Sequence, residues 1–309
     1  MTKPKRHHWW PIAQSCHWTD PKGFVFVTRA DGTTFQTSPL NIGIESELYT
    51  RFTEDSEKDT TIEEWFAETI DGPATKMIQH LLDPSNIRRQ RFYCDPHKAK
   101  TVRSLGFRVR PYVDRIQLPA EIRGAISSYI AALLVRHPNY LAKLAAFHHD
   151  GAASPEEVKN RALDNMLRLY RVYTEKITTA VFLITRRTDF AEYIYADGGL
   201  LVEEPWRREF GVPFDIHAPL TPDIALQVLP IPQSDDLDTA AIVEATNQGV
   251  ARQNRIILGG AQRFVFSRQE PPVKFITSNF GKPAPKNIGY RIVGGRLDTT
   301  YDPSRTYVG

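Results

Sequence analysis

The sequence predicts an α+β fold with a helical first half and a sheet-rich second half, in which an N-terminal hairpin returns to the sheet. Residues 119–178 carry apolar side chains at helical spacing. From about residue 178 onward, short β-rich segments alternate with Gly, Pro and Asp. Near the N-terminus, Asp31-Gly32 lies at the centre of an alternating stretch. We expect a single domain over residues 1–280 and an irregular C-terminal extension over 281–309.

Composition places the chain among folded proteins. Of its 309 residues, 41% are apolar, which is enough for a large core. Lys and Arg total 39 against 36 Asp and Glu, so the net charge of +3 is too small to imply a polyanion partner, and local charge must carry that argument. The two cysteines, Cys16 and Cys94, are too few for a disulfide scaffold, so we expect a cytoplasmic protein.

Neither a membrane span nor a signal peptide is expected. No apolar run approaches the roughly 20 residues that a membrane-spanning helix needs. Residues 1–20 lack the apolar centre of a signal peptide. We therefore expect no membrane partner, and the sequence leaves the oligomeric state open.

The first elements are a hairpin and a broken pair of helices. Residues 24–36 alternate apolar and polar side chains around the Asp-Gly turn, which predicts a hairpin. Helical spacing begins near residue 60, is interrupted at Gly72-Pro73 and resumes to residue 82. We therefore expect two helices with a break between them.

Two longer helices follow. One begins after Pro119 and stops at His137-Pro138, because a residue before proline disfavours the helical region. The other begins with Ser154, followed three residues later by Glu157, which is the pattern of a capping box. Both have one continuous apolar face and are expected to lie in the core.

Strands dominate the second half. The β-rich segments are TTAVFLITR, FAEYIYAD, FDIHAPL and DIALQVLPI. A further helix is expected from Leu237 to about Ile257, and the final strands are expected at RFVFSR and VKFITS.

An arginine-rich segment over residues 84–117 has Phe and Tyr interleaved. Basic side chains beside aromatic platforms are typical of single-stranded nucleic acid binding. The candidate nucleic-acid-binding residues are Arg88, Arg89, Arg91 and Tyr93. The alternative is a solvated amphipathic connector, since charge clusters commonly form ordinary surface.

The N-terminal stretch KRHHWWP raises the question of a metal or acid-base site. Imidazole and carboxylate groups suit a divalent transition metal, and the candidate ligands are His8, Glu45 and Asp197. Adjacent residues of an extended strand point to opposite faces, so at most one of His7 and His8 faces a given site. No phosphate-binding glycine loop followed by Lys-Ser/Thr and no Gly-x-Ser-x-Gly elbow is present.

Six segments then occur in a recognisable order: KRHHWWP, IESELYTRF, IEEWFAETIDGPATKMIQHLL, AEIRGAISSYIAALLVRHPNY, HAPLTPDIALQVLP and ATNQGVARQNRIILGGAQRFVFS. Together they resemble the uncharacterised bacterial family catalogued as domain of unknown function four-two-three-eight, over roughly residues 5–268. The matching positions are His7, His8 and Pro11 in its opening His-His-x-x-Pro motif, Arg136 and Pro138 in its mid-chain Arg-x-Pro helix end, and Asn247 in its late helix. Where the family has Ser-Asp-Asn-Pro, this chain keeps only Asp197. The family has no established activity, so the resemblance implies positions and no reaction.

Two classes of function remain open. A phosphodiester hydrolase of nuclease type would use a histidine to move the proton and an arginine to stabilise the developing charge. Its candidate catalytic residues are His7, His8, Arg136, Asp197 and Asn247. The alternative is a non-catalytic module that binds nucleic acid or a protein through the arginine-rich segment. Convergence of the candidate side chains on one concave pocket favours the enzyme, and scatter favours the module.

Two placements are expected within this hypothesis. The guanidinium of Arg136 reaches inward to a carboxylate or a bound anion. One of the two histidines faces the interior and bonds a carboxylate, with Asp197 as the first candidate, while the other lies at the rim. The competing interpretation is structural: His8 caps a strand, Arg136 closes a helix and Asp197 begins a turn.

Overall fold

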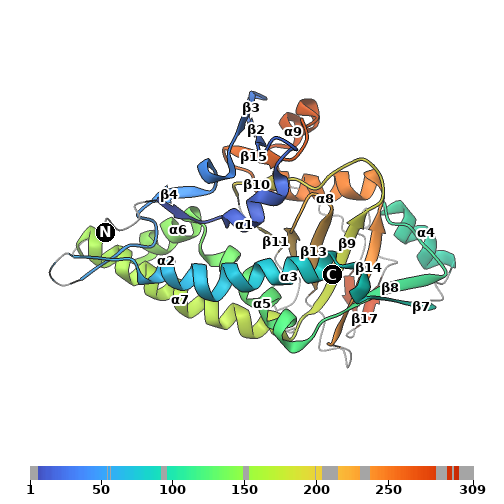
Figure 1. The fold of residues 1–309 in the computed structure, drawn as a ribbon, viewed down its shortest axis with the longest axis horizontal. Helices are drawn as coiled ribbons and strands as arrows, with labels where there is room; N and C mark the ends of the chain where they lie inside the picture. The colour runs from blue at the N-terminus through green and yellow to red at the C-terminus, as the bar shows by residue number, and fades with distance from the viewer. Residues whose placement is uncertain are drawn as a thin grey trace, which may run out of the picture.

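The computed structural model confirms the mixed α+β fold, with a large sheet at one end, long helices that extend away from it and a small sheet beside them (Figure 1). The structure describes residues 6–53, 55, 57–91, 96–148, 153–198, 200–203, 215–229, 237–282, 291–293 and 296–298. In that part of the chain, no helix has the length and apolar character needed to cross a membrane.

The long helices form as their sequence signals predict. The main helices of this layer are α5 (Ala120–Val135), α6 (Pro138–His148) and α7 (Pro155–Thr178). The side chain of Ser154 accepts from the Glu157 N–H at 3.2 Å, and the Glu157 carboxylate accepts from the Ser154 N–H at 2.8 Å. This is the predicted capping box, and it fixes where α7 begins.

The expected break at Gly72-Pro73 is absent, because the chain remains helical through it. α2 (Thr61–Trp65) runs into a π-helical segment, η3 (Phe66–Asp71), which runs into α3 (Gly72–Leu82). A wider π turn accommodates a proline that lacks an N–H donor, so the helix continues past Pro73.

The large sheet has the order β11-β12-β13-β9-β14-β8-β7. Its strands are β7 (Ile87–Arg91), β8 (Tyr112–Gln117), β9 (Val181–Arg187), β11 (Leu201–Glu203), β12 (Asp215–Pro219), β13 (Ile224–Leu229) and β14 (Thr239–Ala245). β14 and β9 are parallel, and the other neighbours are antiparallel. Two strands of the first half, β7 and β8, thus complete a sheet that we expected from the second half alone. Both lie in the arginine-rich segment, on either side of α4 (Pro96–Ser104).

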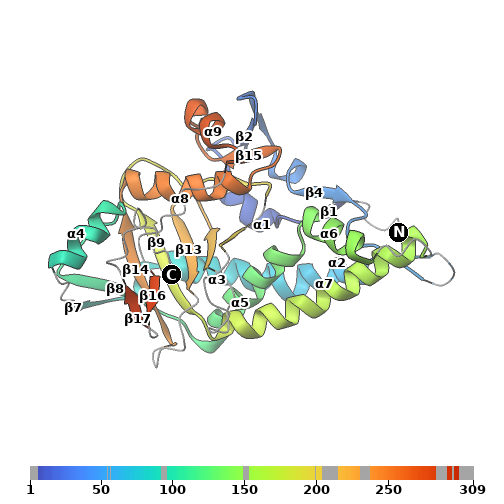
Figure 2. The same cartoon turned by 180° about the vertical axis from the view of Figure 1, so that it is seen from behind.

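One face of the large sheet forms the core with the long helices. Ile116, Ile184, Ile216 and Ile242 are buried on this face and belong to one hydrophobic cluster with residues of α3, α5 and α7. Side chains alternate along a strand, so the neighbouring residues point to the opposite face. That opposite face is covered by α8 (Asn247–Gly260), which lies between the large and small sheets (Figure 2).

The small sheet contains the predicted hairpin and has the order β10-β15-β2-β3. Its strands are β2 (Val25–Arg29), β3 (Thr34–Thr37), β10 (Tyr195–Ala196) and β15 (Phe264–Ser267). The hairpin therefore returns to strands of the second half, but in a sheet separate from the large one. Trp10 is fully buried and stacks on Tyr195 with ring centroids 4.1 Å apart, which anchors the N-terminal segment to this sheet.

Shorter elements complete the chain. The short helical segments are α1 (Ile12–Ser15), η1 (Cys16–Trp18), η2 (Pro39–Asn41) and η4 (Pro84–Asn86). The paired short strands are β1 (Arg6–His8) with β4 (Ile44–Ser46), β5 (Arg51–Phe52) with β6 (Lys58–Asp59), and β16 (Arg291–Val293) with β17 (Arg296–Asp298). The last pair lies in the expected irregular extension.

Two expectations near the C-terminus are wrong. The helix expected from Leu237 begins only at Asn247, because the residues before it form β14, which buries the alternate residues Ala240 and Ile242. The segment VKFITS forms α9 (Val273–Asn279) instead of a strand. Short apolar runs fit either element, and packing against α8 selects the helix here.

Candidate functional site

The N-terminal strand places its two histidines differently. β1 pairs with β4, which sets His7 opposite Glu45. His7 is fully buried, and its Nδ1 accepts from the Tyr49 N–H at 2.9 Å. His8 is half-buried, and its N–H donates to Glu63 Oε1 at 3.4 Å. One histidine thus faces the interior and the other lies nearer the surface, as the extended backbone requires.

The guanidinium of Arg136 reaches inward to a carboxylate, as expected. The side chain of Arg136 is fully buried just after α5. Its Nη1 donates to Asp71 Oδ1 at 3.0 Å, and its Nε donates to the carbonyl of Trp9 at 2.8 Å. The hydroxyl of Tyr49 donates to the carbonyl of Arg136 at 2.6 Å. One arginine therefore ties the end of α5 to the N-terminal strand and to η3.

Four polar atoms near this arginine are buried and have no hydrogen-bond partner among the described residues: His8 Nδ1, Glu63 Oε2, Tyr129 Oη and Arg136 Nη2. We call these four residues the buried polar cluster. Burial raises the pKa of Glu63 to about 7, against smaller opposing effects of the His8 N–H and the Arg136 charge. Burial also lowers the pKa of His8, with help from the charges of Arg6 and Arg136. The cluster therefore combines a carboxyl group whose pKa is raised to about 7 with a histidine whose pKa is lowered.

Asp197 lies beside the same helix end but has other partners. Its carboxylate accepts from the N–H groups of Gln262 at 2.8 Å and Arg263 at 2.9 Å. Its carbonyl accepts from Nε2 of His137, the residue after Arg136. The expected bond between an interior histidine and Asp197 is therefore not the one that forms, because two backbone donors use this carboxylate.

Asn247 lies apart from the other candidate catalytic residues. It begins α8, and its Oδ1 accepts from the Ala191 N–H at 2.9 Å. The structure thus brings His7, His8 and Arg136 together, places Asp197 next to them through His137, and holds Asn247 elsewhere.

A metal site is not formed by the described side chains. Among them, no three His, Cys, Asp or Glu residues are grouped so that they could hold a metal ion. Of the candidate ligands, Glu45 is paired with His7 and not with His8, while Asp197 is occupied by backbone donors.

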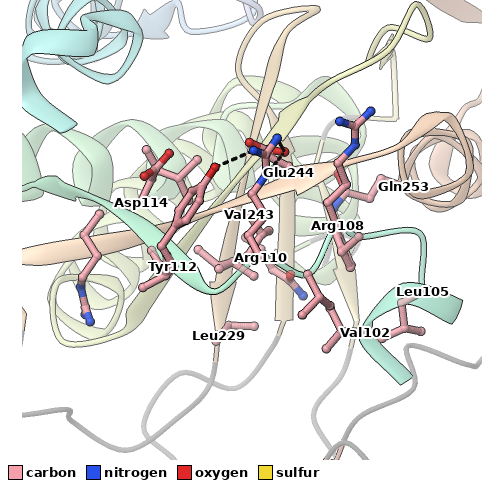
Figure 3. Close-up of a pocket in the computed structure, with 18 of the residues that line it drawn as sticks. Val102, Leu105, Arg108, Arg110, Tyr112, Asp114, Leu229, Val243, Glu244 and Gln253 are labelled. Atoms are coloured by element: carbon pink, nitrogen blue, oxygen red, sulfur yellow. Dashed lines mark hydrogen bonds and ion pairs between the residues drawn. The ribbon is translucent and has the colours of Figure 1, made fainter. Parts of the chain in front are cut away.

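A cavity of about 630 Å³ lies on the face of the large sheet that α8 covers (Figure 3). We call it the sheet cavity. Its floor is a row of residues paired in register across five neighbouring strands: His217, Gln227, Leu183, Ala241 and Arg115. Residues paired in this way point to the same face of a sheet. The row has a polar pair at one end, small and apolar residues in the middle, and an arginine at the other end.

The walls of the sheet cavity come from helices and from the loop before β8. Val102 and Leu105 lie on the side of α4, and Gln253 and Ile256 come from α8 (Figure 3). The hydroxyl of Thr185 donates to Gln253 Oε1 at 3.1 Å, which fixes that amide against the sheet. Most of the surface exposed in the cavity is apolar, as is typical of small-molecule sites, although about half of the lining residues have polar or charged side chains.

Two glycines hold the loop before β8 against α8. Gly106 has a φ of +88°, and a Cβ at this position would lie 2.2 Å from the backbone nitrogen of Gly249. The carbonyl of Gly106 accepts from the Thr246 N–H at 2.9 Å. Only a residue without a side chain permits this approach, and it positions Phe107 and Arg108 at the cavity.

Arginines from separate segments meet at the sheet cavity, and together they outnumber the carboxylates. The lining holds Arg91, Arg108, Arg110, Arg115 and Arg252 with Asp114 and Glu244. Arg110 donates to Glu244 at 2.6 Å and to the hydroxyl of Tyr112 (Figure 3). Arg108 donates to Asp189 at 2.8 Å. These pairs orient two of the guanidinium groups.

The candidate nucleic-acid-binding residues lie at the edge of the same sheet. Arg88, Arg89 and Arg91 are exposed on β7, the terminal strand. The guanidinium carbon of Arg89 lies 3.9 Å from the centre of the Tyr112 ring, and its Nε donates to Asp114 at 2.9 Å. Tyr93 lies outside the described residues. The interleaved arginines and aromatics therefore form a strand pair beside the sheet cavity.

The sequence did not point to Glu63 of the buried polar cluster, to Asp71 as the partner of Arg136, or to the polar residues in the floor of the sheet cavity. Glu63 and Asp71 follow the polar face of an amphipathic helix, where acids are unremarkable. Gln227 interrupts the apolar run of β13 and is 5% exposed. A polar residue inside a strand buried on both faces is the signal that could have identified the cavity floor.

Comparisons with known proteins identify a family. The family model described as Protein of unknown function (DUF4238) matches residues 16–179. The match covers α2–α7 and begins after the two N-terminal histidines. No curated protein and no solved structure matches the chain.

Proposed function

Since this chain belongs to the family of proteins of unknown function (DUF4238), we propose a function from geometry alone: the arginine-bearing edge of the large sheet binds single-stranded nucleic acid. The observation that carries the proposal is the convergence of arginines from β7, the loop before β8, β8 and α8 on the sheet cavity. If these arginines formed only solvated surface, guanidinium groups from such distant parts of the chain would not be expected to meet at one cavity.

The chemistry of this surface suits a single strand. Guanidinium groups bind phosphates through paired hydrogen bonds. On the exposed edge strand β7, Arg88 is paired with Arg115 on the cavity side, while Arg91 is paired with Tyr112 and points to the other face. Tyr112 offers an aromatic ring beside Arg91, already in contact with Arg89. Bases of a single strand stack on such rings without regard to sequence.

Binding through phosphates must depend on salt. We expect a fluorescently labelled single-stranded oligonucleotide to bind, with affinity that falls roughly 20-fold between about 50 and 200 mM salt if about three phosphates are neutralised. The double variant Arg88→Ala, Arg91→Ala should weaken binding and reduce the slope of log Kd against log salt by about 1.4. Fluorescence anisotropy measures both.

The matched control is Arg171→Ala, which removes an exposed arginine from α7. This variant should leave affinity and salt slope unchanged. Equal loss in the control and in the double variant, or binding that ignores salt, would reject the proposed surface.

A phosphodiester hydrolase is the second candidate, and the buried polar cluster favours it. A carboxyl group with a pKa of about 7 can take or give a proton at neutral pH. Arg136 Nη2 has no partner among the described residues and could donate to an anionic oxygen. The test is a nuclease and phosphatase panel on the purified protein after metal analysis. Activity that disappears in Glu63→Gln with the fold intact would support this candidate, and activity that survives would exclude the cluster.

A further inference from the structure

The sheet cavity has more structure than the binding of a phosphate backbone requires. Phosphates need only exposed positive charge, which β7 already supplies. The cavity adds the apolar middle of its floor, Leu183 and Ala241, and two polar side chains that are almost fully buried, His217 at 6% and Gln227 at 5% exposure. A cavity of about 630 Å³ that combines apolar surface with buried polar groups at one end is typical of a small-molecule site.

We propose that the sheet cavity binds one nucleotide, with the base edge at Gln227 and His217 and the phosphate toward the arginines. This inference rests on the proposed function, because it specifies that one nucleotide of a bound single strand enters the sheet cavity. The same chemistry is offered by a free nucleoside monophosphate and by an unstacked nucleotide of a strand.

The cross-strand row supports this orientation. Gln227 and Arg115 are three strand spacings apart, or about 14 Å at about 4.8 Å per spacing. Leu183 and Ala241 lie between them, and Ala241 leaves room above the floor. The flat face of a base fits on this apolar stretch, between Gln227 at one end and Arg115, whose Nε donates to Thr239 Oγ1 at 2.9 Å, at the other. A bare phosphate would contact one end only.

The polar end can address a base edge. Gln227 and His217 are directly opposite on adjacent strands, so their Cβ atoms are about 5 Å apart. An amide offers a donor and an acceptor together, which is the combination that base edges pair with. Gln253 from α8 adds a second amide, whose oxygen is held by Thr185.

The test compares ligands that share the phosphate and differ in the base. We expect AMP or UMP to bind the full chain about tenfold more tightly than ribose 5-phosphate in isothermal titration calorimetry, because the base adds hydrogen bonds and apolar contact. Gln227→Leu should remove this advantage and leave the affinity for ribose 5-phosphate unchanged. Gln79→Leu, an exposed glutamine of α3, is the matched control and should bind as the parent does.

The variant also separates this inference from the proposed function. Gln227→Leu changes no charge, so the salt slope for the labelled oligonucleotide should stay the same. If the oligonucleotide binds with the expected salt slope but neither mononucleotide binds more tightly than ribose 5-phosphate, the nucleotide site is wrong and the proposed binding at the arginine-bearing edge is retained. If mononucleotides bind with an affinity that Gln227→Leu reduces while no oligonucleotide binds, the cavity binds a free nucleotide and the proposed strand binding at the arginine-bearing edge is wrong. If Gln227→Leu lowers the melting temperature, Gln253→Leu replaces it in the same comparison. The inference is overturned if both variants still bind AMP or UMP more tightly than ribose 5-phosphate.

Discussion

Glu63 should make the stability of the protein depend on pH in a direction opposite to that of an ordinary carboxylate. Burial raises the pKa of Glu63 from 4.5 to about 7, so between these values the folded state holds a proton that the unfolded state has released. Stability is therefore greatest below the unfolded pKa and is lost as the pH rises through about 7. Full burial would make this change about 3 kcal/mol, and screening at the half-buried side chain reduces it to about 1–2 kcal/mol.

The substitution Glu63→Gln isolates this effect. Glutamine resembles the protonated acid and keeps an acceptor for the His8 N–H, so the variant should match the parent at about pH 4 and exceed it by about 1–2 kcal/mol at about pH 8. Comparison with the parent is necessary because the lowered pKa of His8 contributes the opposite slope below its ordinary value of 6.5. Urea unfolding at a series of pH values measures the difference.

The matched control is Glu68→Gln, an exposed acid of η3, for which the difference from the parent should not vary with pH. A constant difference for Glu63→Gln across this pH range, or a variant less stable than the parent at pH 8, would refute the reasoning about burial.

The remaining predictions concern backbone and charge. Arg136→Lys should cost about 2–4 kcal/mol in chemical denaturation, because a lysine cannot hold both Asp71 and the Trp9 carbonyl from a buried position; unchanged stability would remove the inward role. Gly106→Ala should cost more than about 2 kcal/mol and weaken nucleotide binding, since its Cβ would collide with α8. Gly23→Ala, at φ +83° in open space, carries only the backbone strain of about 1 kcal/mol, and an equal loss in both variants would contradict the close approach.

Local signals explain which elements the sequence predicts. α7 has a capping box and continuous helical spacing, so its start and face follow from neighbours in the chain. β7 and β8 were not expected as strands, because the arginines at an edge of the sheet obscure the alternation of apolar residues. α9 was expected as a strand, since a run as short as VKFITS fits either period.

The candidate sites depend on contacts between distant segments, and this limits what the sequence can show. Arg136 is drawn inward as expected, but its carboxylate partner, Asp71, is 65 positions away and lies in an ordinary amphipathic helix. The floor of the sheet cavity is assembled from five strands, and each strand contributes one residue. Such a row becomes visible only when the register between strands is known.

The most direct test of nucleic acid binding at this edge is photochemical cross-linking of the full chain to a single-stranded RNA that contains 4-thiouridine, followed by mass spectrometry. Cross-links form only at the contacted surface, so the measurement reports position independently of affinity. We predict that the adducts map to β7, β8 and the loop that carries Phe107 and Arg108. Adducts confined to α7 or to the small sheet, or the absence of adducts under conditions of low salt, would contradict binding at the arginine-bearing edge.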